Sequence, residues 1–82
     1  MLIDTHCHLD FPDFDADREQ VIQRAKHEEV SFIINIGSSL RGSQAGVNLA
    51  KQYDCIWATV GMHPHEADKY DQNTRAELIE LA

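Results

Sequence analysis

Cysteine is scarce in this sequence, and its scarcity excludes one class of small protein. The 82-residue chain has two cysteines, too few for the disulfide framework that small secreted domains use in place of a large core. The chain also lacks an apolar run long enough to cross a membrane, and its first residues lack the basic segment and apolar core of a signal peptide. We therefore expect a cytoplasmic protein.

Basic residues are also in the minority. Seven lysines and arginines stand against 14 aspartates and glutamates, which gives a net charge of -7. This balance argues against a basic face that binds nucleic acid directly. It does not exclude a phosphate-bearing substrate, because a bound metal ion supplies positive charge locally.

A domain near this size buries only about 60% of its unfolded surface, so the chain alone is expected to be marginally stable.

Three short apolar segments are predicted to be strands, at residues 2–5, 32–36 and 55–61. The second and third are apolar almost throughout, which is typical of a strand covered on both faces in a parallel sheet. Trp57 lies in the third segment, where it could stack on a nucleotide base, but packing in the interior is the expected role. The same reasoning predicts that Cys55 lies in the core.

Helices are predicted between and after these strands. Side chains able to cap a helix N-terminus precede three segments, namely Asp15, Ser39 and Thr74, the last paired with Glu77 in a capping box. In the first helix Val21, Ile22 and Ala25 form an apolar stripe. Gly42 and Gly46 count against the second helix, since each costs about 1 kcal/mol relative to alanine.

The resulting order, strand and helix in strict alternation, indicates an α/β fold with parallel strands and right-handed helical connections. A doubly wound nucleotide-binding sheet is the competing architecture. That fold needs a glycine-rich turn after its first strand, and this chain has "DTHCHLD" there. A barrel of alternating strands and helices is therefore favoured, with its site built by the loops that follow the strands.

Polar side chains gather at the end of the first strand. Asp4, His6 and His8 are two residues apart, so in a regular strand they project from the same face. Two such imidazoles can ligate one divalent metal ion and leave positions open for water and substrate. Asp4 could add a ligand or orient a histidine from behind. Cys7 alternates away from them, which predicts a buried, inert thiol.

A second pair, His63 and His65, follows the third strand in "VGMHPH". An H-x-H motif alone is equally consistent with two hydrogen-bonded or exposed histidines that bind nothing. Four of the five histidines follow predicted strands, however, and this grouping favours a site. His27 lies on a predicted helix and is interpreted as a solvated surface residue. Asn35, near the end of the second strand, is expected to cap a loop rather than enter the site.

These motifs resemble those of a known family. "IDTHCHLDF" and "VGMHPHEA", at this separation, are similar to the TatD family of metal-dependent hydrolases, which belongs to the amidohydrolase-like barrels. Between them "FDADREQVIQRA" and "FIINIG" match a helix and a strand of that family, so the resemblance runs through all 82 residues. H-x-H alone would leave the superfamily open, whereas the pair of motifs is specific.

The resemblance implies a (β/α)8 barrel of the TIM type, in which residues 1–82 form the N-terminal βαβαβα portion. This portion is a single partial domain, with the remainder of the barrel absent. The implied site holds one or two divalent ions, Mg²⁺, Mn²⁺ or Zn²⁺, with His6 and His8 as metal ligands and Asp4 behind them. His63 is implied to be catalytic and to contact the substrate, and His65 is a further substrate-binding candidate.

The implied activity is hydrolysis of phosphodiester bonds in DNA by metal-activated water. The alternatives are a barrel hydrolase acting on esters or amides, such as D-aminoacyl-tRNA, and a non-catalytic fragment. Relatives also use a glutamate after the fourth strand and an aspartate after the eighth, which these residues do not include. We therefore expect the 82 residues alone to be inactive, and either to self-associate or to need the rest of the barrel.

Overall fold

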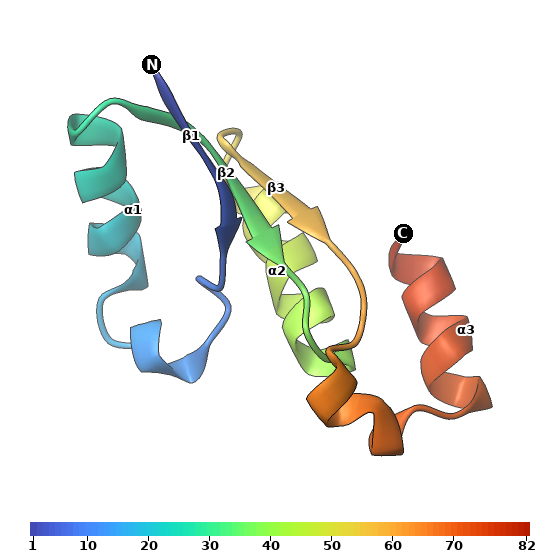
Figure 1. Ribbon diagram of the computed structural model, residues 1–82. Helices are drawn as coiled ribbons and strands as arrows, with labels where there is room; N and C mark the ends of the chain where they lie inside the picture. The colour runs from blue at the N-terminus through green and yellow to red at the C-terminus, as the bar shows by residue number, and fades with distance from the viewer.

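Three parallel strands in the order β1-β2-β3 form the centre of the computed structural model, which describes all of residues 1–82 (Figure 1). The elements alternate as predicted and are β1 (Leu2–Cys7), α1 (Arg18–His27), β2 (Val30–Ile36), α2 (Leu40–Gln52), β3 (Ile56–Thr59) and α3 (Gln72–Leu81). Two short 3-10 helices interrupt the connections, η1 (Pro12–Phe14) and η2 (Pro64–Lys69). No helix combines the length and apolar character needed to span a bilayer.

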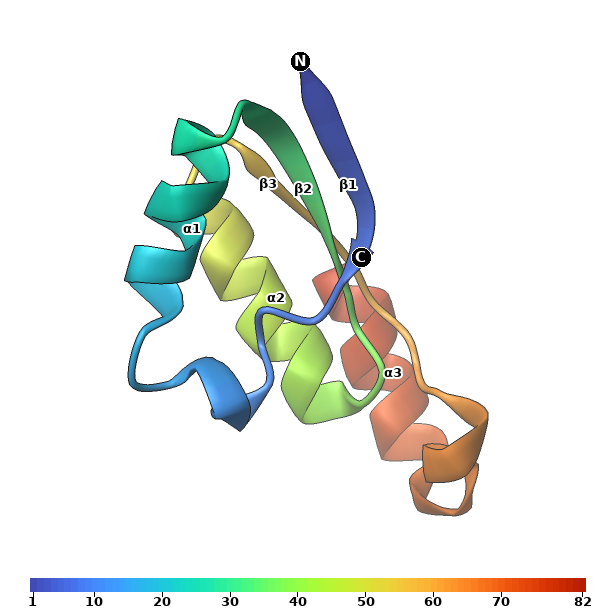
Figure 2. The ribbon, with the colours of Figure 1, turned by 60° about the vertical axis from the view of Figure 1, so that its left-hand side comes forward.

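The helices α1 and α2 lie on the same face of the sheet (Figures 1 and 2). A doubly wound sheet would place helices on both faces, whereas a barrel keeps its helices outside a sheet whose strands follow in sequence order. The sequential strand order and the one-sided helices therefore agree with the predicted barrel architecture. After β3, the chain continues through η2 into α3, which contacts α2.

The hydrophobic core lies between the sheet and these two helices. Its five buried members come from the loop after β1, from both helices and from β2 and β3: Leu9, Ile22, Ile33, Leu49 and Ile56. The stripe predicted for α1 is confirmed, since Ile22 is fully buried and Val21 and Ala25 pack beside it. Cys7 and Cys55 are partly buried free thiols that pack against the same cluster.

The opposite face of the sheet is uncovered, which corrects one expectation. Side chains alternate along β2 and β3, so Phe32 and Trp57 point away from the helices, and they are 41% and 64% exposed. The prediction that Trp57 packs in the interior is therefore wrong for this structure. The apolar residues around Trp57 are typical of a strand that is covered on both faces. Residues 1–82, however, place helices on only one face of the sheet.

Two predicted helix caps are also wrong. Asp17, not Asp15, occupies the N-cap position of α1, and Asp15 instead accepts a hydrogen bond from the Arg18 guanidinium at 2.8 Å. In α3 the cap is Asp71, whose carboxylate accepts from the Thr74 backbone N–H at 2.8 Å. Thr74 is three residues inside the helix because Asp71 is the better acceptor one turn earlier. The third predicted cap is confirmed in α2, where the Ser39 hydroxyl accepts from a backbone N–H.

Candidate functional site

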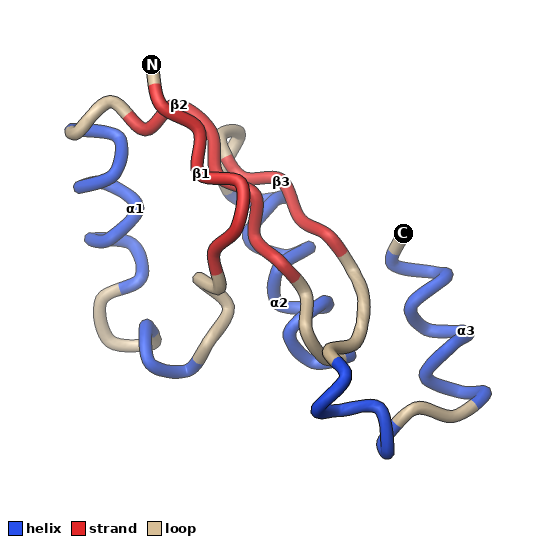
Figure 3. The backbone as a smooth tube through the Cα atoms, in the orientation of Figure 1, coloured by secondary structure: helices blue, strands red, loops and turns tan.

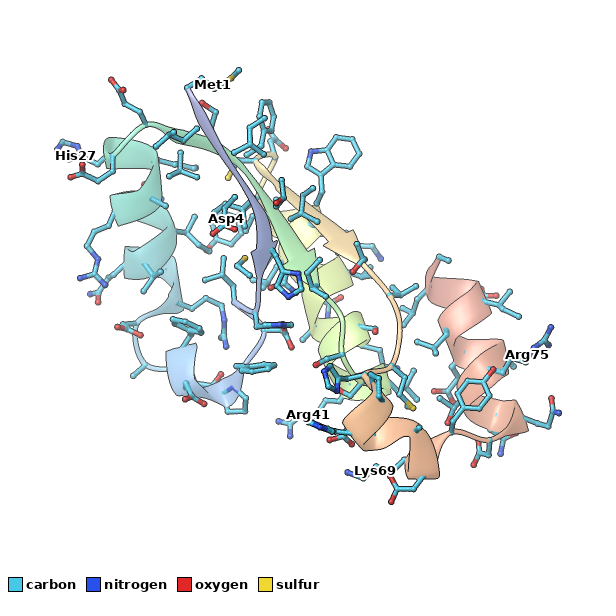
Figure 4. All side chains as sticks on the ribbon, in the orientation of Figure 1. Met1, Asp4, His27, Arg41, Lys69 and Arg75 are labelled. Atoms are coloured by element: carbon cyan, nitrogen blue, oxygen red, sulfur yellow. The ribbon has the colours of Figure 1, made fainter.

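The predicted site residues lie at the carboxyl ends of the strands. His6 is the penultimate residue of β1, and His8 is the first residue after that strand. The connection after β3 carries His63 and His65. The loops after the three strands emerge at the same end of the sheet (Figure 3). His27, by contrast, is exposed at the end of α1, far from the Lys69 end of the molecule (Figure 4), as expected for a surface residue.

The first histidine pair is formed by His6 and His8. Their ring centroids are 5.2 Å apart and the rings meet edge to face. Bonds from zinc to imidazole nitrogen are about 2.1 Å long, so rings at this separation can reach a single ion. Phe11 stacks on the His8 ring with centroids 4.7 Å apart, which restricts rotation of that ring.

The hydrogen bonding of His8 fixes which ring nitrogen is free. Its Nδ1 lies 3.0 Å from the carbonyl oxygen of Ile36. A carbonyl oxygen can only accept, so Nδ1 carries the proton and the neutral ring presents an unprotonated Nε2. An unprotonated nitrogen with its ring held by a second hydrogen bond is the arrangement in which histidine ligates metals.

His63 is held in the opposite tautomer. Its Nδ1 accepts a hydrogen bond from the His65 backbone N–H at 3.1 Å, as the N-terminal cap of η2. The neutral ring therefore carries its proton on Nε2 and presents a donor to solvent. Its own backbone N–H donates to the Ser38 carbonyl at 2.7 Å, so the loop after β3 is tied to the loop after β2. Pro64 stands at the first position of η2 and fixes the chain direction there.

His65 and Glu66 complete this end of the molecule. The His65 ring is exposed and lies with its centroid 4.6 Å from that of His63. The Glu66 carboxylate pairs with the Lys69 ammonium at 2.8 Å. That pairing, assisted by the two nearby histidines, lowers the pKa of Glu66 below its ordinary value. An ionised Glu66 carboxylate therefore lies beside the pair formed by His63 and His65.

Asp4 does not share a face with the two histidines of its strand. The pairing of β1 with β2 slips between Asp4 and Cys7, where two residues of β2 oppose three of β1. Asp4 pairs with Ile33, a residue on the helix side, and Figure 4 shows it on the side of β1 nearer α1. The expectation that Asp4 projects with His6 and His8 is therefore wrong, because a bulge resets the alternation.

The contact of Asp4 explains the bulge. Its Oδ1 accepts a hydrogen bond from the His6 backbone N–H at 3.0 Å. This local bond competes with regular strand pairing, as short acidic side chains often do. Asp4 thus contacts the main chain that presents His6 and has no bond to either imidazole ring.

The two histidine pairs do not merge into one cluster within this chain. No group of three or more histidine, cysteine, aspartate or glutamate side chains is close enough to hold a metal ion. A catalytic zinc site normally takes three protein ligands. The donors present, His6 and His8, therefore fit part of such a site.

Sequence reasoning missed one residue beside this site, Asp10, and with it the contact that Asp10 makes with Asn35. The Asp10 backbone N–H and carboxylate both bond the side chain of Asn35, which is fully buried. Asn35 does hold a loop, as expected, but the loop is the one after β1. A signal was available in the sequence: Gly42 and Gly46, four residues apart in α2, both abut this pair.

A separate groove of about 600 Å³ lies beside the loop after β1 and the first turns of α2. Its charged lining residues are Asp10, Asp15, Arg18, Arg41 and Glu66. None of the four site histidines lines it. Arg18 is engaged there with the backbone of Leu9 and Phe11, so it holds the loop that follows His8.

The sequence of the chain matches one family of known proteins. A family model described as TatD related DNase matches residues 3–82. The chain is 36% identical to the 3'-5' ssDNA/RNA exonuclease TatD of Shigella flexneri, over 99% of this chain and 31% of that protein. It is 37% identical to the uncharacterized metal-dependent hydrolase YabD of Bacillus subtilis, over 100% of this chain and 32% of that protein.

A solved structure shows the same likeness. The crystal structure of YJJV, a TatD homologue from Escherichia coli K12, superimposes with a TM-score of 0.86 at 34% identity, over 96% of this chain and 30% of that one. The chain thus spans about a third of the length of the relatives it matches. Its fold is the N-terminal portion of a (β/α)8 barrel, as predicted, and the chain belongs to the family of TatD-related DNases.

Proposed function

We propose that these residues provide the first metal-binding element and a substrate-contacting histidine of a metal-dependent hydrolase that cleaves phosphodiester bonds in single-stranded DNA. The observation that carries the proposal is the opposite tautomers of two histidines at one end of the sheet. His8 presents an unprotonated Nε2, and His63 presents an Nε2–H donor. Relatives named as ssDNA/RNA exonucleases support the choice of substrate.

The two pairs then have different tasks. His6 and His8 hold a divalent ion, Mg²⁺, Mn²⁺ or Zn²⁺, which supplies the Lewis acidity that phosphodiester hydrolysis needs. The Nε2–H of His63 donates to a phosphate oxygen and holds the scissile group in line, with His65 as a second contact. Because hydrogen bonds to charged groups contribute more than neutral ones, His63 also favours the more negative transition state.

The ligand assignment is tested in a protein that holds this chain together with the rest of a (β/α)8 barrel. His6→Ala and His8→Ala should each lower metal affinity by more than the roughly 10–100-fold that loss of a supporting partner costs. Metal content by mass spectrometry and hydrolysis of a labelled single-stranded oligonucleotide are both measured. His27→Ala is the matched control, since His27 is exposed at the remote end of α1. If either site variant keeps wild-type metal content, the assignment is wrong.

The role of His63 is separated from its role as a helix cap by two substitutions. His63→Asn keeps an acceptor near the Nδ1 position for the His65 N–H but cannot reach the substrate. His63→Gln keeps a donor near the Nε2 position. We expect His63→Asn to retain metal and to lose about 10–100-fold in kcat, as for a hydrogen bond to a charged group, and His63→Gln to retain more activity. A folded His63→Asn protein without metal would instead make His63 a ligand.

A further inference from the structure

We propose that Asp10 and Asn35 form a side-chain clamp that positions His8, with α2 as the wall behind it. The proposal deepens the proposed function, since it rests on His8 as a metal ligand. Asp10 and Asn35 are therefore positioning residues, because they bond each other and not the His8 imidazole ring, and they hold the segment that carries this ring.

The clamp consists of two reciprocal hydrogen bonds. The Asp10 backbone N–H donates to Asn35 Oδ1 at 3.2 Å, and Asn35 Nδ2 donates to Asp10 Oδ1 at 3.0 Å. Asn35 is 0% exposed, so no water can replace a lost partner without rearrangement. A buried amide with both ends satisfied specifies one position of its partner, because an unpaired buried donor or acceptor is costly.

His8 is joined to the same stretch of β2. Its Nδ1–H bonds the carbonyl of Ile36, the residue that follows Asn35. Three hydrogen bonds thus connect residues 8–10 to residues 35–36. The strand ladder ends at the pair formed by Cys7 and Asn35, immediately before His8. The clamp continues the fixed register beyond this last strand pair.

The contact between the clamp and α2 explains two glycines in that helix. A Cβ added at Gly46 would lie 2.7 Å from Asn35 Nδ2, and one added at Gly42 would lie 2.7 Å from Asp10 Oδ2. Neither distance is tolerated between real atoms. Each glycine lowers the stability of the helix relative to alanine. Both glycines stand where the helix contacts the clamp: Gly42 contacts Asp10 and Gly46 contacts Asn35.

The test exploits the chemistry of the pair. In Asn35→Asp a carboxylate replaces the amide donor and faces the Asp10 carboxylate, so the two groups repel. Asp10→Asn leaves an oxygen to accept from Asn35 and should be mild. The double variant, Asp10→Asn with Asn35→Asp, restores one donor opposite one acceptor. Asp54→Asn, at an exposed residue remote from the clamp, is the matched control for the loss of a negative charge.

Two readouts are made on a protein that holds this chain together with the rest of a (β/α)8 barrel. The first is the dissociation constant of Co²⁺, followed by its visible absorption. The second is the tautomer of His8, read from its ¹⁵N chemical shifts in metal-free protein. We expect Asn35→Asp to weaken Co²⁺ binding by about 10–100-fold, as for supporting partners of ligands, and to mix the His8 tautomers. Asp10→Asn should stay within a few-fold of wild type, and the double variant should recover most of the loss.

The outcomes separate the clamp from the proposed function. If wild-type protein binds no Co²⁺ and cleaves no DNA, the proposed function fails, while the His8 tautomer still reports on the clamp. If Asn35→Asp does not fold, Gly46→Ala takes its place, since it displaces the Asn35 amide without a new charge. A folded Asn35→Asp or Gly46→Ala protein with a wild-type His8 tautomer overturns the clamp, and so does a double variant no better than Asn35→Asp.

Discussion

At the scale of single residues, His8 and His63 have the same side chain but different chemistry. A bond to a backbone carbonyl favours the tautomer of His8 with its proton on Nδ1. A bond from a backbone N–H favours the tautomer of His63 with its proton on Nε2. The first ring thereby presents an unprotonated Nε2 and the second presents an Nε2–H donor. The motifs H-x-H and H-P-H give no indication of this difference, because it depends on which backbone atom meets each ring.

The thiol between the two histidines gives a residue-scale prediction. Burial raises the pKa of Cys7 above its ordinary value, and the negative charges of Asp4 and Asp10 add to the effect. The thiol is therefore protonated at neutral pH and should react slowly with thiol reagents. Asp4→Asn should speed the reaction at pH 7, because removal of a nearby negative charge moves the pKa back toward its ordinary value.

The measurement uses a Cys55→Ser background, so that only Cys7 reports, with a chelator present. Reaction rate is followed against pH with a chromogenic disulfide reagent. Asp13→Asn, which removes an exposed charge from η1, is the control and should leave the rate unchanged. An Asp4→Asn rate equal to the wild-type rate at every pH would contradict the placement of Asp4 beside the thiol.

The residues that sequence reasoning placed well are those whose position follows from order along the chain. All four site histidines were expected after strands; His8, His63 and His65 are found there, and His6 is the penultimate residue of β1. Asp4 was misplaced because a bulge depends on a local hydrogen bond that alternation ignores. The Asp10 contact joins residues 25 apart in sequence, and no period along the chain encodes it.

At the scale of elements, the cap of α3 decides how that helix responds to acid. The Thr74 backbone N–H, assisted by the Thr74 side chain, holds the pKa of Asp71 below its ordinary value. A depressed pKa means that the ionised carboxylate stabilises the folded helix. This contribution is present above the ordinary aspartate pKa and is lost as the pH falls through the lower folded value.

We therefore expect α3 to loosen at acidic pH in the wild-type protein. Asp71→Asn keeps an oxygen that caps the helix but cannot titrate, so it should remove this part of the pH dependence. Asp71→Ala should loosen α3 at all pH values. Amide hydrogen exchange in α3, measured between pH 3 and pH 6 and corrected for intrinsic rates, distinguishes the three. Equal protection in all three proteins would show that the cap contributes nothing.

At the scale of the whole molecule, one face of the sheet is covered and the other is not. Apolar side chains on the uncovered face include Phe32 and Trp57, together with Ile3, which pairs with Phe32. Sequence reasoning correctly identified β2 and β3 as strands, but its expectation that both faces of these strands are covered is not met within residues 1–82. It could not show which face the 82 residues leave open, because that depends on how many layers the chain itself supplies.

The 82 residues alone should therefore associate and show no turnover. Exposed apolar surface of this kind drives association, and two histidines lack the further ligands a site needs. Sedimentation of the isolated polypeptide should give a mass that rises with concentration. Trp57→Lys should reduce the association, whereas Gln44→Lys, which adds the same charge on the exposed side of α2, should not. A stable monomer that degrades DNA with added Mg²⁺, Mn²⁺ or Zn²⁺ would contradict this expectation.

The turn that follows β2 has a consequence for motion. The carbonyl of Ile36 holds the His8 ring, and the carbonyl of Ser38, two residues later, holds the His63 backbone N–H. A fluctuation that opens residues 36–38 breaks both hydrogen bonds at once. It therefore releases the His8 ring and the His63 backbone together. Local opening at the end of β2 would therefore free the proposed metal ligand His8 and the proposed substrate donor His63 at a common rate, as one unit of cooperative opening.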